Sequence, residues 1–137
     1  MTTVGGFKRL FKRLNPPTVV KPFSRYSQAV EAPANCRWLH ISGQVGATPD
    51  GTILKGFEAQ AKQCWVNIIA ILTAAGMGVE DLVKVNIFVT SADHVAASRA
   101  IRDAALKGAE PASTFLVIAA LAHPDLVVEI EAVAAKA

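Results

Sequence analysis

Apolar residues recur along this 137-residue chain with two different periods. Between residues 57 and 75 they follow one another every three to four positions, which predicts an amphipathic helix that ends at Gly76. Ser91 signals the start of a second helix, which we expect to run to about Lys107 and to end at Gly108. The pattern therefore predicts two helices, one across the middle of the chain and one after it.

Polar and apolar residues alternate before, between and after these helices, as is typical of strands. The clearest alternation covers 82–90, where one face of the expected strand is apolar. Two further strands are expected at 113–120 and 126–134. Nearer the start of the chain, residues 26–31 and 37–42 are expected to pair as a hairpin around a Pro-Ala-Asn turn.

The expected elements follow the order ββαβαββ. This order predicts an α+β fold of two layers, in which both helices cover one face of a mixed, largely antiparallel sheet. Hydrophobic residues make up 52% of the chain, yet no segment approaches the run of roughly 18 apolar residues that a membrane span needs. We therefore expect no membrane segment, and we expect another subunit to cover the second face of the sheet.

The cysteines and the lack of ligand motifs restrict the chemistry. Cys36 and Cys64 have neither the spacing of a metal site nor that of a disulfide framework. They suit a reducing cytoplasm, and no apolar segment of the secretory type follows the basic N-terminal residues. There is no glycine-rich phosphate loop and no cluster of His and Cys, so we expect a cytoplasmic protein without metal or cofactor.

Positive charge is concentrated near the N-terminus. The formal net charge is +3, but residues 1–25 carry six Lys/Arg and no acid, whereas residues 26–137 carry eight Lys/Arg and eleven Asp/Glu. Residues 1–15, which contain FKRL twice, are interpreted as a flexible basic leader to a single domain at 16–137. On a helix the leader would separate basic from apolar side chains; the alternative is a frayed extension. The mildly acidic body argues against a nucleic-acid partner for the folded domain.

Several short segments form an ordered set between about residues 16 and 134. They are Tyr26–Val30, Ile41–Val45, the EAQAKQCWVNIIAILTAAG run, the DLVKVNIFVT strand, Pro111-Ala112 and the VEIEAVA run. With this set the chain resembles the Rid (reactive intermediate deaminase, or YjgF) family. The resemblance implies a chorismate-mutase-like fold and a homotrimer with a small-molecule cleft at each subunit interface. It also implies hydrolysis of enamines or imines to 2-oxo acids and ammonia, without metal or cofactor.

The resemblance assigns roles to particular residues. Glu129 corresponds to a glutamate that holds the attacking water, and Tyr26 to a tyrosine that lines the cleft. Ser42 and Gly43 correspond to a turn with a backbone amide that assists. Ser113 stands where the family has an arginine that grips the substrate carboxylate.

Two further residues are candidates for the cleft. Arg99 aligns with a position that is often asparagine in the deaminases; it could restore a cation, or it could be an exposed helical arginine. Phe115 shares a strand face with Ser113, so it would make the cleft more apolar or pack at the trimer interface. Glu131 shares a strand face with Glu129 and is interpreted as mainly structural.

Three functions follow from these observations. The first is a divergent enamine/imine deaminase with weak or no activity on 2-iminopropanoate and 2-iminobutanoate, since Ser113 cannot replace a charge-assisted bidentate contact. The second is a non-catalytic trimer that binds a small molecule. The third, less favoured, is an RNA-binding or endoribonuclease activity that would use the basic leader, although the sequence has no histidine pair typical of a nuclease.

Overall fold

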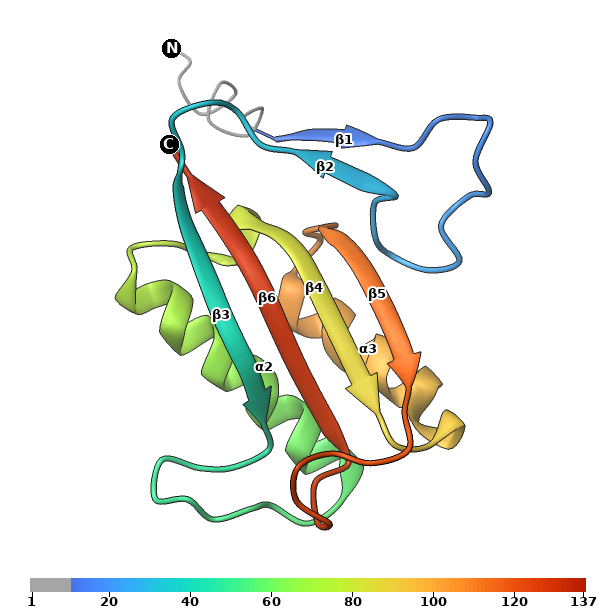
Figure 1. Cartoon of the computed structure of the whole chain (residues 1–137), viewed down its shortest axis with the longest axis vertical. Helices are drawn as coiled ribbons and strands as arrows, with labels where there is room; N and C mark the ends of the chain where they lie inside the picture. Colours follow the sequence, from blue (N-terminus) through green and yellow to red (C-terminus); the bar gives the residue numbers. More distant parts are fainter. Residues whose placement is uncertain (1–10) are drawn as a thin grey trace.

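The computed structural model describes residues 11–137 (Figure 1). Both predicted helices are present, and each is followed by the predicted glycine in a left-handed conformation, with φ of 71° at Gly76 and 91° at Gly108. A short 3-10 turn precedes the second helix. The elements are β1 (Lys12–Leu14), β2 (Ala29–Glu31), β3 (Arg37–Val45), α2 (Phe57–Ala74), η1 (Val79–Asp81), β4 (Leu82–Val89), η2 (Ala92–His94), α3 (Val95–Leu106), β5 (Ala112–Val117) and β6 (Val128–Lys136).

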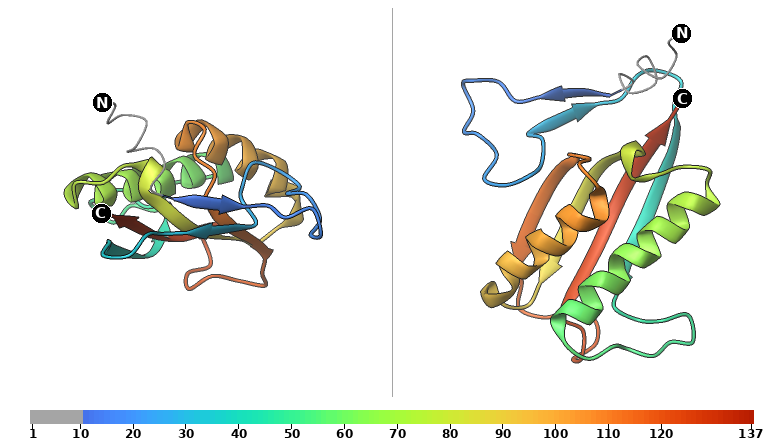
Figure 2. Two further views of the ribbon diagram at one scale, coloured as in Figure 1. Left: turned by 90° about the horizontal axis from the view of Figure 1, so that it is seen from above. Right: turned by 180° about the vertical axis from the view of Figure 1, so that it is seen from behind.

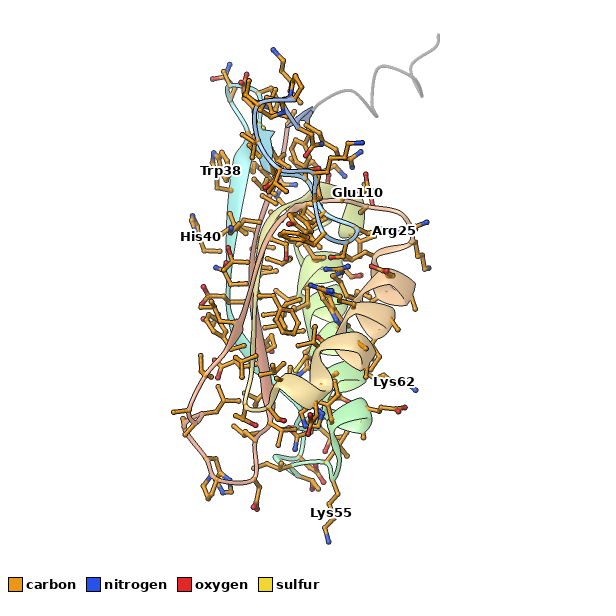
Figure 3. All side chains as sticks on the ribbon, turned by 90° about the vertical axis from the view of Figure 1, so that its right-hand side faces the viewer. Arg25, Trp38, His40, Lys55, Lys62 and Glu110 are labelled. Carbon is orange, nitrogen blue, oxygen red and sulfur yellow. The ribbon has the colours of Figure 1, made fainter. Side chains whose placement is uncertain are left out.

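The main body has two layers. Its four-stranded sheet has the order β3-β6-β4-β5, in which β4 runs parallel to β5 and the other two pairs are antiparallel. Figure 2 shows α2 and α3 together on one face of this sheet. The predicted α+β class, with two helices on one face of a mixed sheet, is confirmed. On the opposite face the side chains of Trp38 and His40 project away from the helices (Figure 3), and no other element of the described chain covers them.

The expected hairpin between 26–31 and 37–42 is wrong. Strand β2 pairs with β1, whereas β3 crosses to the main sheet and pairs with β6. The cause lies in the apolar side chains of β3, since Leu39 and Ile41 pack into the core beside β6. Burying this face stabilises the long-range pairing more than a short loop stabilises a local one.

The predicted basic leader falls mostly outside the described residues, which begin at residue 11. The described part of the FKRL repeat is extended, because Lys12–Leu14 form β1 and pair with Ala29–Glu31 of β2. It is therefore not part of a helix. Strands β1 and β2 form a small ribbon apart from the main sheet (Figure 1). Between residues 11 and 137 no helix has the length and apolarity that crossing a bilayer requires.

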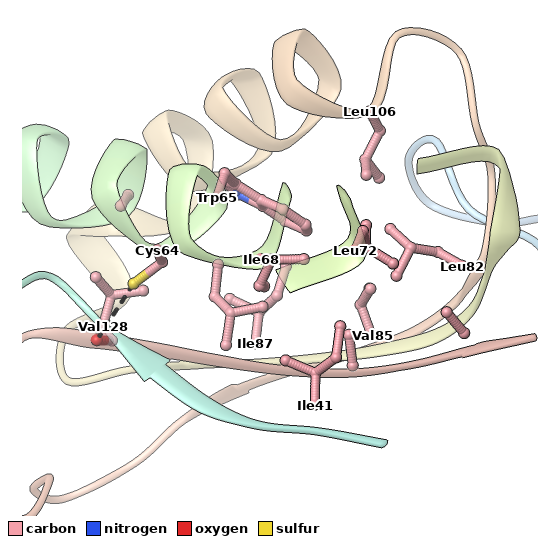
Figure 4. Close-up of a cluster of buried hydrophobic side chains, with 14 of the residues drawn as sticks. Ile41, Cys64, Trp65, Ile68, Leu72, Leu82, Val85, Ile87, Leu106 and Val128 are labelled. Carbon is pink, nitrogen blue, oxygen red and sulfur yellow. Dashed lines mark hydrogen bonds between the residues drawn. The ribbon is translucent and has the colours of Figure 1, made fainter. Parts of the chain in front are cut away.

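The core lies between α2 and the sheet (Figure 4). Cys64, Ile68 and Leu72 of α2 are completely buried and pack in one cluster with Val85 of β4 and Ile130 of β6. These three helix residues are four positions apart, which is the spacing that predicted the helix. The same stripe also holds one polar side chain, that of Gln60.

Gln60 connects α2 to two loops. Its Nε2 donates hydrogen bonds to the carbonyls of Leu54 (2.9 Å) and Asp125 (2.8 Å), and its Oε1 accepts one from the N–H of Val127 (2.9 Å). The side chain is 2% exposed, so these three bonds replace the water that burial removes. Gln60 thereby fixes the loops that enter α2 and β6.

Candidate functional site

Glu129 and Gly43 lie together on the sheet face that the helices leave open. Glu129 belongs to β6, where its register partners are Val45 of β3 and Phe88 of β4. A Cβ added to Gly43 would overlap Oε2 of Glu129 and lie 2.7 Å from its Cδ. The register between β3 and β6 shifts beside this glycine. The missing side chain at position 43 is therefore what leaves room for the Glu129 carboxylate.

The two glutamates of β6 have different surroundings. Oε2 of Glu131 accepts a hydrogen bond from Nδ2 of Asn86 at 2.8 Å, which ties β6 to β4. Glu129 is half-buried, and its carboxylate makes no hydrogen bond or ion pair with any residue that the structure describes. The oxygens of Glu129 thus remain available to water or to a ligand.

The charge of Glu129 also acts through the sheet on Cys64. The pKa of the Cys64 thiol is raised to about 12, mainly by burial and then by the negative charge of Glu129. The thiol donates a weak hydrogen bond to the carbonyl of Gln44 at 3.2 Å. Cys64 is held as a neutral thiol and does not supply a nucleophile.

A cavity of about 250 Å³ lies next to Glu131 on the open face, and Ser42 lines it. Lys84 lines the same cavity and donates a hydrogen bond from Nζ to Oγ1 of Thr114 at 2.8 Å. Lys84 was not among the residues selected from the sequence, although its alternation with buried Val85 places it on the same sheet face as Glu129 and Glu131. The open face of the sheet therefore carries one lysine, Lys84 of β4, in addition to the two glutamates of β6.

Four of the residues selected from the sequence, Tyr26, Arg99, Ser113 and Phe115, line a different cavity of about 170 Å³. This cavity lies on the helix side of the sheet. Ser113 is opposite Val85 in the parallel register of β4 and β5, and Val85 is fully buried beneath the helices. Since register partners point to the same face, Ser113 points toward the helix layer.

Tyr26 reaches this second cavity because its neighbour Ser27 is fixed to the chain that leads into β5. The N–H of Ser27 donates to the carbonyl of Pro111 at 3.1 Å, and its hydroxyl donates to the carbonyl of Glu110 at 2.6 Å. The Tyr26 hydroxyl accepts a hydrogen bond from the N–H of Phe23 at 3.3 Å. The segment before β2 thus forms one wall of the cavity.

Arg102 lines the second cavity as well and was not selected from the sequence. It is 2% exposed, and its Nε and Nη2 donate to Oδ1 of Asp103 at 3.0 and 2.9 Å. A signal was present, because Ser98, Arg102 and Leu106 are four positions apart and form the buried stripe of α3. An arginine on the buried stripe of a helix is rare unless it has a partner, and Asp103 is that partner here.

The two groups of candidates do not meet within one chain. Ser113 is in register with Val85 and Glu129 with Phe88, three residues further along β4, or about 10 Å. The two side chains also point to opposite faces of the sheet. The structure therefore places Glu129, Gly43 and Ser42 on the open face and the remaining four candidates on the helix side.

The three histidines lie apart from one another. His40 is exposed on β3, His94 stacks on Phe57 with ring centroids 4.2 Å apart, and Nδ1 of His123 accepts a hydrogen bond from the N–H of Asp125. No group of three His, Cys, Asp or Glu side chains in residues 11–137 is arranged to hold a metal ion.

The two-layer arrangement and its open sheet face define an α+β protein of the chorismate-mutase-like type. The family model described as Endoribonuclease L-PSP matches residues 17–136 of the chain. The chain belongs to this family, that of the Rid/YjgF proteins.

Individual relatives agree over nearly the whole chain. A 2-iminobutanoate/2-iminopropanoate deaminase of Mus musculus is 31% identical over 131 residues, which cover 94% of this chain and 92% of the relative. A RutC family protein of Pyrococcus horikoshii is 34% identical over 118 residues, which cover 85% and 90% of the two chains. The crystal structure of the Rid family protein YyfB from Yersinia pestis superposes with a TM-score of 0.82 at 33% identity, covering 93% of this chain and 99% of that one.

Proposed function

We propose that the chain is an enamine/imine deaminase that hydrolyses C=N bonds without a cofactor and uses Glu129 to hold the attacking water. The observation that carries this proposal is the free carboxylate of Glu129, which is half-buried over Gly43 and has no partner in the described chain. Two relatives, from Mus musculus and Salmonella typhimurium, are named as 2-iminobutanoate/2-iminopropanoate deaminases.

The chemistry needs one proton acceptor that can later act as a donor. Glu129 takes a proton from water as the water oxygen bonds to the imine carbon, and then passes this proton to the nitrogen, which gives a carbinolamine. Glu129 next transfers the hydroxyl proton of the carbinolamine to its nitrogen as the C–N bond breaks, which releases ammonia and leaves a carbonyl group. A carboxylate already bound to a protein donor would be a weaker acceptor, which is why Glu129 suits this role better than Glu131.

We propose that the active unit is a homotrimer. The open face of the sheet carries Trp38, which is 53% exposed, and the edge strand β5 carries Leu116, which is 46% exposed. Burying such side chains between subunits is favourable. A subunit cleft would also bring Glu129 of one chain near the cavity of Tyr26 and Ser113 in the next, which one chain alone does not do.

The serine at position 113 affects the rate of hydrolysis that we expect for imino acids. The resemblance gives this position to an arginine, and a hydroxyl cannot make the charge-assisted bidentate contact of a guanidinium. We therefore expect slower hydrolysis of 2-iminopropanoate and 2-iminobutanoate than in members that have the arginine.

Release of 2-oxo acid from freshly generated 2-iminopropanoate tests the proposal. Glu129→Gln should lower kcat about 100-fold, since the carboxylate is removed while its shape is kept. Glu131→Gln is the matched control, because a glutamine oxygen can still accept the hydrogen bond from Asn86. Equal activity of Glu129→Gln and wild type would exclude the role of Glu129. A protein that binds ligands but hydrolyses none would instead be the non-catalytic trimer.

A further inference from the structure

The cavity of about 250 Å³ on the open face of the sheet contains one side chain of each charge. Lys84 of β4 and Glu131 of β6 both line it. Within residues 11–137 neither of them forms an ion pair, with the other or with any other side chain. From this arrangement we infer that the cavity binds a small α-amino acid as a zwitterion, with the carboxylate of the ligand at Lys84 and its ammonium group at Glu131.

The strand register holds the two charged side chains near each other but apart. Lys84 is opposite Val133, and Glu131 lies two residues from Val133 on the same strand, so the two charged residues are diagonal neighbours on one face. The Cβ atoms of such neighbours are about 7–8 Å apart. Nζ of Lys84 donates to Oγ1 of Thr114 at 2.8 Å, and Oε2 of Glu131 accepts from Nδ2 of Asn86 at 2.8 Å. Neutral partners therefore keep the positive and the negative group separate.

Both charged groups keep hydrogen-bonding capacity for a ligand. The ammonium group of Lys84 has three N–H bonds, of which one is used in the described chain, and Oε1 of Glu131 accepts no hydrogen bond there. The carboxylate of an amino acid can accept from Lys84 while its ammonium group donates to Glu131, and both contacts are charge-assisted. Both side chains are half-buried, where such contacts are stronger than in open water.

The other residues of the cavity suit a short ligand. His40 belongs to β3 and is opposite Val133, so Val133 lies between the imidazole and Lys84. Figure 3 shows His40 projecting from the open face, where a ring N–H can donate to the ligand carboxylate. Ser42 lies two residues beyond His40 and adds a hydroxyl that can accept from the ligand ammonium group. Pockets for drug-sized ligands hold about 300–1,000 Å³, so this smaller cavity selects a small amino acid.

The two opposite charges exclude simpler ions of the same size. An anion alone would place negative charge next to Glu131, and a cation alone would place positive charge next to Lys84. Only a zwitterion satisfies both groups at once. Glu129 does not line this cavity, so amino-acid binding does not require the hydrolytic chemistry that we propose for Glu129.

Isothermal titration calorimetry of the full-length protein with three ligands of matched size tests the site. L-alanine carries both charges, L-lactate has a hydroxyl in place of the ammonium group, and L-alaninamide has a neutral amide in place of the carboxylate. We expect L-alanine to bind at least about tenfold more tightly than either analogue, and Lys84→Gln or Glu131→Gln to weaken it about tenfold. Lys62→Gln removes a charge from an exposed position on α2 and should leave the affinity unchanged. Equal affinities for the three ligands, or wild-type affinity in Lys84→Gln, would overturn the site.

Two further measurements keep the test decisive. Lys84→Arg keeps the positive charge, so it should bind L-alanine more tightly than Lys84→Gln even if removing the charge weakens the assembly. If wild type binds no L-alanine and Lys84→Gln dissociates the trimer in sedimentation, the two charges pair between subunits and the amino-acid site is excluded.

The Glu129→Gln variant separates this site from the proposed hydrolytic site. It should bind L-alanine like wild type while failing to hydrolyse imines, whereas Glu131→Gln should hydrolyse imines and bind L-alanine weakly. Loss of L-alanine binding in Glu129→Gln would place the amino acid at the hydrolytic site and overturn a separate cavity for it.

Discussion

The carboxylate of Glu129 occupies the space that a side chain on residue 43 would fill. The contact involves the flexible end of Glu129 and not backbone atoms, so a larger residue at position 43 would displace the carboxylate without breaking β3. Gly43 is thus a positioning residue for the acid that we propose to act on water.

Gly43→Ala should therefore lower kcat about 10- to 100-fold and change the stability little. The reason is that the added methyl group moves the Glu129 carboxylate off its place. Measured rates for Gly43→Ala, Glu129→Gln and the double variant check this, since the double variant should be no slower than Glu129→Gln alone. Additive losses in the double variant would mean that Gly43 acts independently of Glu129.

Gln60→Ala should lower the free energy of unfolding by about 2–4 kcal/mol, because three buried hydrogen-bonding groups lose their partner. Urea unfolding followed by tryptophan fluorescence measures the change. Gln63→Ala is the control: Gln63 has a single side-chain hydrogen bond, to Asn67 on the same helix, and should cost under about 1 kcal/mol. Similar losses in the two variants would contradict the special role of Gln60.

Trp38→Glu or Leu116→Glu should dissociate the proposed trimer, since each places a charge in an apolar interface. Analytical ultracentrifugation would then report a monomer. Val66→Glu, at a side chain that is 57% exposed on the helix side, should leave the assembly intact. If only Val66→Glu dissociated the trimer, the interface would be formed by the helices and not by the open face of the sheet.

Because the pKa of the Cys64 thiol is raised, we expect the folded chain to lose stability at alkaline pH. Its pKa rises from an ordinary 9.0 to about 12 in the folded chain. Below pH 9 the thiol is therefore protonated in both the folded and the unfolded chain, and its contribution to the free energy of unfolding is fully present. Above pH 9 the unfolded thiol ionises first, and the contribution falls until the pH passes about 12. Unfolding measured from pH 8 to 11 should show a shallower decline for Cys64→Ala than for Cys36→Ala. Parallel curves for the two variants would refute this.

Local patterns predicted the helices and the strand faces well. The four-residue recurrence of Cys64, Ile68 and Leu72 defined α2, and the strand alternation around Val85 correctly predicted a buried face of β4. The partner of β3 could not be predicted from such patterns, because the apolar face of β3 fits β6, which is distant in the sequence.

The candidate site was predictable only in part. Tyr26, Arg99, Ser113 and Phe115 were selected from the sequence, and the structure places all four in one cavity. Arg102 was missed, because a charged residue on a helix is ordinarily expected to face solvent, although its four-residue spacing from Ser98 and Leu106 is that of the buried stripe of α3.

The helix α3 is the connection between the parallel strands β4 and β5. Arg102 and Ser113 therefore belong to one continuous β4–α3–β5 stretch, whereas Glu129 and Gly43 meet only after distant strands have paired. Ligand selection and bond cleavage would then be encoded in separate modules of the chain. Substitutions within the crossover could change which molecule is accepted while the reaction itself stays the same.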